Sequence, residues 1–286
     1  MHKTIKVCFY QIKQIFSTPR IPLLFILIAI FIYATVQPVS DFAKDVGILP
    51  TPWAFPHITN DYICQLVIMA GVILLFCDAP FKSDAYIYII HRAGNISWVM
   101  GMCLYIFSLA FLYIMVVFVA TLLALLPSIE LQNGWGKIWG TLARTQAGNQ
   151  IGLAFSVNDY IVGAYLPVQA TIISFLLEWA CCAWLGLITY FFNNITDSVM
   201  GSLIAAAFVF IDITVTNEWD YTFYRISPVT LAQIHTLSGS QSMFGLTLKY
   251  AIGFFLLSIA FFVILCLLMP YAGKKFFVKH RLKEGK

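Results

Sequence analysis

Long apolar runs that carry at most one charged residue dominate the pattern along this chain. A helix needs roughly 20 apolar residues to cross the hydrocarbon core of a bilayer, which is about 30 Å thick. The sequence contains six runs of about this length, at residues 21–39, 62–80, 98–126, 162–192, 199–215 and 250–271. The composition agrees, because 60% of the residues are hydrophobic and only 10% are charged. We therefore predict an all-α, polytopic membrane protein with six transmembrane helices in a single domain over residues 1–286.

The basic residues are distributed unevenly between the two sets of segments that flank these runs. The set that includes both ends of the chain holds twelve of them, namely Lys3, Lys6, Lys13, Arg20, Lys82, Arg92, Lys274, Lys275, Lys279, Arg281, Lys283 and Lys286. The other set holds five, which are Lys44, Lys137, Arg144, Arg225 and Lys249. Lys and Arg near membrane spans are retained in the cytoplasm, so we expect both termini to be cytoplasmic. The net charge of +4 then reflects topology and contact with anionic lipid, and it gives no reason to expect nucleic acid as a partner.

Segments outside the six runs also show helical periodicity. Residues 3–16 place apolar side chains on one face, so we expect the leader, residues 1–20, to form an interfacial amphipathic helix. In the predicted outer segment, Trp135 and Trp139 lie on one helical face, which favours the lipid headgroup region. Residues 272–286 form a basic tail that we expect to be cytoplasmic.

A short helix is also predicted between the fifth and sixth runs. Ser227 is a favourable N-cap and Pro228 a favourable first residue, and the helix extends to about Leu237. Its roughly ten residues are too few to span a bilayer. We therefore expect it to lie flat on the membrane or to enter partway as a re-entrant element.

Acidic residues inside the apolar runs are the best individual candidates for function. Glu178 lies near the middle of the fourth run, where a carboxylate costs about 2.5–3.5 kcal/mol and must find a partner. Two interpretations stay open: Glu178 lines a transport path, or it is a protonated or hydrogen-bonded side chain that holds two helices together. Asp212, near the outer end of the fifth run, is a second path candidate, although snorkelling or capping also explains it.

The sequence contains no motif that supports catalysis or a metal centre. A phosphate-binding loop, an HExxH pair and a GxSxG turn are all absent. The seven cysteines include no CxxC pair, so we expect free thiols. We predict no catalytic residue, no metal ligand and no cofactor on this chain.

The order of elements and three short strings resemble the permease subunits of ABC-2 type transporters in Gram-positive bacteria. The strings are IHRAGNISWVMG at residues 90–101, GWGKIWGTLA at 134–143 and RISP at 225–228. The resemblance implies a multi-pass permease of the bacterial cell membrane that works as an exporter. ATP and Mg would bind a separate cytoplasmic ATPase subunit, and a second permease copy or a homologous permease would complete the transporter. The long segment between the third and fourth runs favours peptide or lipid-like cargo.

The resemblance also implies that the segment after the second run is the coupling helix that docks on the ATPase. The residues assigned to this contact are Phe81, Lys82, Asp84, Tyr86, Ile87, Ile90 and Arg92. Tyr86, Ile87 and Ile90 are expected to share one apolar face, although a helix on the membrane surface would show the same periodicity. The glutamate often found in the coupling region of this family is absent, and Asp84 is the nearest acidic residue.

Three other classes of protein are rivals to this interpretation. A membrane enzyme would need a cluster of His, Asp or Glu at one membrane level, and the acidic residues here are dispersed. A secondary transporter would show repeated halves, or short Gly- or Pro-broken spans at matching positions, and the sequence shows neither pattern. A membrane scaffold or sensor subunit that transports nothing fits the same apolar runs. A partner ATPase would distinguish these alternatives from a permease.

Overall fold

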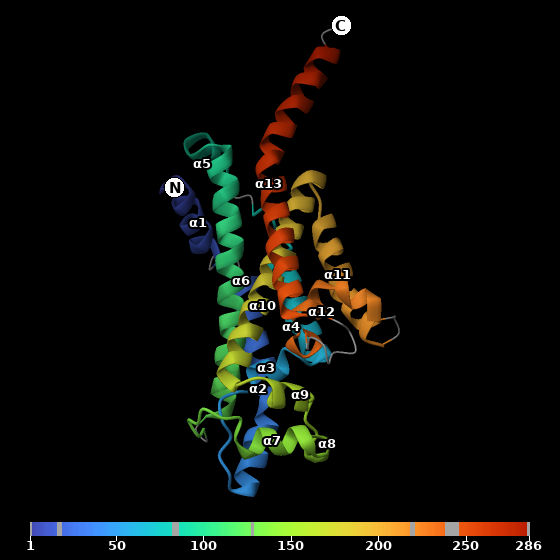
Figure 1. Ribbon diagram of the computed structural model, residues 1–286. Helices are drawn as coiled ribbons and strands as arrows, with labels where there is room; N and C mark the ends of the chain where they lie inside the picture. Colours follow the sequence, from blue (N-terminus) through green and yellow to red (C-terminus); the bar gives the residue numbers. More distant parts are fainter. Residues whose placement is uncertain are drawn as a thin grey trace.

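The computed structural model describes residues 2–15, 19–81, 86–126, 129–217, 221–237 and 246–284, and these form an all-helical protein (Figure 1). A helix lies over each of the six predicted runs: α2 (Arg20–Val46), α4 (Tyr62–Phe76), α6 (Asn95–Leu125), α10 (Pro167–Thr196), α11 (Met200–Asn217) and α13 (Leu248–Glu284). Four of them, α2, α6, α10 and the Leu248–Pro270 part of α13, are long and apolar enough to cross a membrane. The helices α4 and α11 are apolar but shorter. The chain is therefore a multi-pass membrane protein by the length and composition of its helices.

Helix α10 is the centre of the bundle. It contacts α4, α6, α11 and α13, and about two-thirds of the residues in its most apolar stretch are buried in the protein. The absence of a side chain at Gly186 lets α10 pack closely on α6 and α4, since an added Cβ there would lie 2.7 Å from Ile106 of α6 and 2.9 Å from Phe76 of α4. Small residues at helix contacts allow close packing, which stabilises bundles in lipid.

The two ends of the bundle differ (Figure 1). Helix α1 (His2–Gln14), α5 (Tyr86–Ala93) and the carboxyl-terminal part of α13 lie at one end. The short helices α3 (Phe55–Ile58), α7 (Gly136–Arg144), α8 (Ala147–Gln150) and α9 (Asp159–Ala164) lie at the other. Both terminal helices therefore reach the same end of the molecule.

The leader helix α1 packs on the protein. Val7 and Cys8 are buried against α6, and a Cβ on Gly101 would lie only 2.6 Å from Val7. Ile5 and Phe9, which share the predicted apolar face, are exposed. The periodicity predicted the helix, but the face that packs against protein is rotated from the face that was expected to enter lipid.

The tryptophans of α7 are buried within the end formed by α3 and α7. Trp139 donates from Nε1 to the Thr51 carbonyl at 2.9 Å, and Trp135 donates to the Tyr165 carbonyl at 2.9 Å. The two indole rings lie 5.2 and 4.9 Å from the buried His57 ring. The expectation that these tryptophans face lipid headgroups was wrong, because their stripe covers His57. Burial lowers the pKa of His57 to about 3.

The predicted helix after residue 227 is present in two pieces, α12 (Pro228–Ala232) and the 3₁₀ turn η3 (Ile234–Leu237). The Ser227 side chain accepts from the Thr230 N–H, as expected of an N-cap. The helix breaks at Gln233, where the Thr236 hydroxyl donates to the Thr230 and Gln233 carbonyls at 3.0 and 2.8 Å. A side chain that donates hydrogen bonds to backbone carbonyls takes the place of the N–H donors of a continuous helix.

Candidate functional site

A fully buried carboxylate lies in the interior of the bundle. Glu178 occupies the middle of α10 and has no exposed surface. The Gln65 amide of α4 donates from Nε2 to both carboxylate oxygens, at 2.9 and 3.1 Å. Asp61 caps the start of α4 by accepting from the N–H groups of Ile63 and Cys64, and this fixes the helix one turn before Gln65. The predicted candidate Glu178 is thus held between α10 and α4.

Two further buried polar atoms, on Gln65 and on Ser174, lack a hydrogen-bond partner. Gln65 Oε1 and Ser174 Oγ are both buried and have no protein partner. Ser174 lies four residues before Glu178 on α10, so the two side chains share one helical face. Buried polar atoms are nearly always hydrogen-bonded, and an exception calls for water or an ion. This cluster, Glu178, Gln65 and Ser174, is called the α10 polar cluster below.

Asp212 belongs to a separate polar contact. It lies on α11, is buried, and accepts hydrogen bonds from the Thr230 hydroxyl and from Gln233 Nε2, the latter at 3.3 Å. Both donors come from the segment that contains α12 and the break at Gln233. Snorkelling to water therefore does not explain Asp212, because α12 covers it. Asp212 joins α11 to α12, whereas Glu178 joins α10 to α4.

The assigned coupling residues lie at the end of the bundle that holds both terminal helices, and Lys82 and Asp84 fall outside the described residues. Phe81 and Tyr86 pack inward, with their rings 5.2 Å from Tyr105 and 5.0 Å from Trp98. The inward face of α5 also includes the half-buried Ile89, Ile90 and Ala93.

The outward face of α5 differs from the one expected. Ile87 is 62% exposed and its neighbour Tyr88 is 74% exposed, and Arg92 is exposed beside them. Of the three residues predicted to share an apolar face, Ile87 is exposed, whereas Tyr86 and Ile90 are half-buried. The reason is that Trp98 and α1 cover the side of α5 that carries Tyr86 and Ile90. The apolar surface that stays uncovered is formed by Ile87 and Tyr88, and it is called the α5 surface below.

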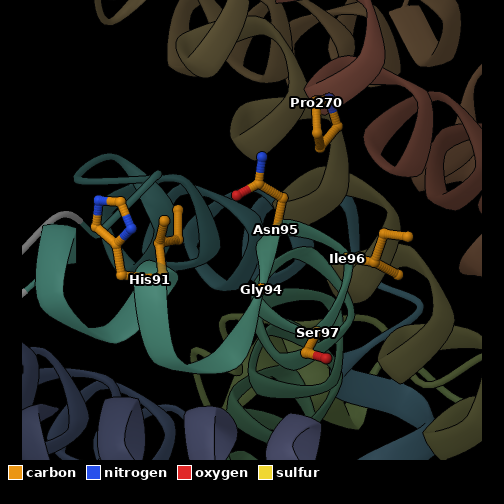
Figure 2. A pocket seen from close by; sticks show the side chains of 7 residues that line it. His91, Gly94, Asn95, Ile96, Ser97 and Pro270 are labelled. Atoms are coloured by element: carbon orange, nitrogen blue, oxygen red, sulfur yellow. The ribbon is translucent and has the colours of Figure 1, made fainter. Parts of the chain in front are cut away.

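A cavity of about 470 Å³ lies where α5, α6 and α13 meet (Figure 2). It is lined by Ile90, His91, Gly94, Asn95, Ile96, Ser97 and Pro270. Figure 2 shows Asn95, at the start of α6, below Pro270 of α13. The cavity adjoins the α5 surface and is part of the same end of the molecule.

The turn that leads from α4 toward α5 is clamped by three other helices. Asn193 of α10 donates to the carbonyl oxygens of Ala79 at 2.9 Å and Cys77 at 3.3 Å, and its Oδ1 accepts from the Gly201 N–H at 2.7 Å. Arg20 of α2 forms a bidentate ion pair with Asp78, with N to O distances of 2.6 and 2.7 Å. The turn is therefore tied to α10, α11 and α2 at once.

Sequence reasoning missed two residues of these sites. Gln65 and Asn193 are polar residues within apolar runs, which was the available signal, but their partners lie 113 and 114 residues away in the sequence. In the parts of the chain that the structure describes, no group of three His, Cys, Asp or Glu side chains is placed to hold a metal ion.

The arrangement defines a class of protein: a multi-pass, all-helical membrane protein with a buried carboxylate inside its bundle. Comparisons with protein-family models, with curated proteins and with solved structures give no match. The chain can therefore be placed further only from its own residues.

Proposed function

We propose that this protein is the membrane-spanning permease subunit of an ATP-driven exporter of the ABC-2 type. The observation that carries the proposal is the α5 surface. Ile87 and Tyr88 expose large apolar side chains on a short helix at the end that holds both terminal helices. An exposed apolar helix face surrounded by polar residues is typical of a docking site for another protein.

The charge distribution gives this end an orientation. Twelve of the seventeen Lys and Arg residues belong to segments assigned to the cytoplasm, among them the segment that contains α5. A cytoplasmic ATPase would therefore meet Ile87 and Tyr88. Its movement would pass through the turn after α4, which Asn193 ties to α10, and so reach the helix that carries Glu178.

The proposal includes six crossings in a bacterial cell membrane. Helix α4 has 15 residues, about 22 Å at 1.5 Å per residue, so it does not cover the hydrocarbon core alone. The turn at residues 77–81 would complete its crossing, and the segment at residues 227–237 would complete that of α11 as a re-entrant element. Irregular backbone is tolerated at this depth where protein buries it, and α12 is fully buried.

The test is whether a partner ATPase binds the α5 surface. Ile87→Asp and Tyr88→Asp should release the co-purifying ATPase subunit, because each places a charge in an apolar contact. Leu131→Asp is the matched control, since Leu131 is 89% exposed in the segment between α6 and α7, at the opposite end. Tyr86→Asp is a poor probe, because its ring packs on Trp98. Retention of the ATPase by both α5 variants would refute the docking role.

A secondary transporter is the second candidate, and α4 and α11 favour it. These two short apolar helices contact each other, and each carries a polar residue of the interior, Gln65 or Asp212. Discontinuous helices at the core of a bundle are typical of ion-coupled transporters. Cargo transport in vesicles with an ion gradient and without ATP or an ATPase would select this alternative.

A further inference from the structure

The carboxyl group of Glu178 has no cationic side chain among its hydrogen-bond and ion-pair partners in the described part of the chain. Its hydrogen-bond partner is the neutral amide of Gln65. The ion pairs of the described chain join Arg20 to Asp78, Lys44 to Asp41 and Arg144 to Asp159, and none of them includes Glu178. An isolated carboxylate inside a membrane costs several kcal/mol, so a bound cation would stabilise the folded protein.

The neighbouring atoms form an oxygen-rich set of ligands. Gln65 Oε1 and Ser174 Oγ are fully buried and lack partners; Gln65 is hydrogen-bonded to the carboxylate, and Ser174 lies one helical turn before Glu178 on α10. Rotation of the Gln65 amide by 180° exchanges its oxygen and nitrogen, and it brings the carbonyl oxygen to the position that now lies 2.9 and 3.1 Å from the carboxylate oxygens. Carboxylate, carbonyl and hydroxyl oxygens are the ligands of hard cations.

The number of carboxylates decides the charge of the cation. Glu178 is the one carboxylate that the described hydrogen bonds join to Gln65, whereas Asp212 accepts from Thr230 and Gln233, although it lies near enough to interact electrostatically with Glu178. The ligands of the cluster include one carboxylate, which matches the charge of a monovalent cation. We propose that Glu178, Gln65 and Ser174 bind a monovalent metal cation such as sodium. The inference deepens the proposed transport function by assigning an ion to the path that α10 lines.

The test measures thermal unfolding of the purified permease in lipid nanodiscs at pH 8. Choline chloride is replaced stepwise by NaCl or KCl at constant ionic strength, so that charge screening does not change. A ligand that binds only the folded state raises the unfolding midpoint, and we expect a saturable rise of about 2–4 °C. Glu178→Gln, which keeps the size of the side chain, should abolish the rise, and Ser174→Ala should raise the half-saturating concentration about tenfold. Thr189→Val, which removes a buried hydroxyl elsewhere on α10, is the matched control and should keep the response.

Direct binding of ²²Na⁺ to the wild-type protein and to Gln65→Leu provides a second measurement if Glu178→Gln does not fold. The proposal is overturned if neither cation stabilises the wild-type protein, or if Glu178→Gln responds equally. Stabilisation by acidification alone would also overturn it, because a proton would then be the compensating charge. These experiments need neither the ATPase nor the cargo, so their failure leaves the test of the α5 surface unaffected.

Discussion

Gly186 offers a quantitative test of how the three central helices pack. In Gly186→Ala the new Cβ would lie 2.7 Å from Ile106 Cγ2 and 2.9 and 3.0 Å from two ring carbons of Phe76. Favourable carbon contacts lie at about 3.5–4.0 Å, so these neighbours must move by roughly 0.5–1 Å. Both are fully buried, and neither can rotate into open space.

The expected magnitude is a balance of two terms. Overpacking a close-packed interior costs about 1–3 kcal/mol, whereas replacing Gly by Ala within a helix gains up to about 1 kcal/mol. We therefore expect Gly186→Ala to lower the free energy of unfolding by about 1–2 kcal/mol. Gly253→Ala, in α13, gains the helix term alone, because no atom lies within 4 Å of its added Cβ. It should raise stability by up to about 1 kcal/mol.

The assay is thermal unfolding of both variants in the same nanodiscs, followed by intrinsic tryptophan fluorescence. One kcal/mol corresponds to a shift of about 2–4 °C for a protein of this size. The two variants should shift the midpoint in opposite directions. If Gly186→Ala stabilised the protein as much as Gly253→Ala does, the contact between α4, α6 and α10 would not exist as described.

Three other predictions concern single side chains. Because the pKa of His57 is about 3 in the folded protein and near 6.5 when unfolded, only the unfolded state binds a proton between these values. The free energy of unfolding should then fall by about 1.4 kcal/mol for each pH unit below pH 6.5. In equilibrium unfolding, His57→Phe should reduce this dependence on pH. An unchanged pH dependence in the variant would contradict the burial of His57. Asn193→Leu should lower the free energy of unfolding by about 1–3 kcal/mol, because two carbonyls and one N–H lose a buried partner. The control Asn194→Leu should cost less. Equal losses in the two variants would exclude the proposed role of Asn193 in holding the turn after α4. In transport assays Glu178→Gln should impair export while staying folded, and Glu178→Leu should cost about 1 kcal/mol of stability; normal export by Glu178→Gln would remove the residue from the path.

The positions of the helices followed from hydropathy because spans need length and apolarity, and both are local properties. The predicted run at residues 62–80 agrees with α4, and the run at 98–126 agrees with α6, each within a few residues at its ends. The predicted start of the fourth run, at residue 162, was wrong, because α9 ends at Ala164 and α10 begins at Pro167. A residue before proline disfavours helical backbone, and this signal was present in the sequence.

The contacts made by amphipathic segments were harder to predict, because an apolar helix face can be buried either in lipid or against protein, and both give the same sequence periodicity. The stripe of α7 packs on protein, and α1 packs on α6 through a face that includes Val7 and Cys8, while Ile5 and Phe9 of its predicted stripe are exposed. For the candidate sites, hydropathy identified Glu178 as unusual, but it could not identify Gln65 as its partner. Such a pairing depends on how two distant helices are rotated toward each other, and no local pattern records that rotation.

The contact between α1 and Gly101 has a consequence for biosynthesis. Val7 leaves the ribosome long before its partner does, since 94 residues separate the two positions. At about 5–20 residues per second, α1 waits roughly 5–20 s for α6 to be made. During that interval the face of α1 that carries Val7 and Cys8 has no α6 to pack against, so this face is uncovered by α6 in the nascent chain and buried in the finished protein. Docking of α1 can then occur only after α6 has been inserted.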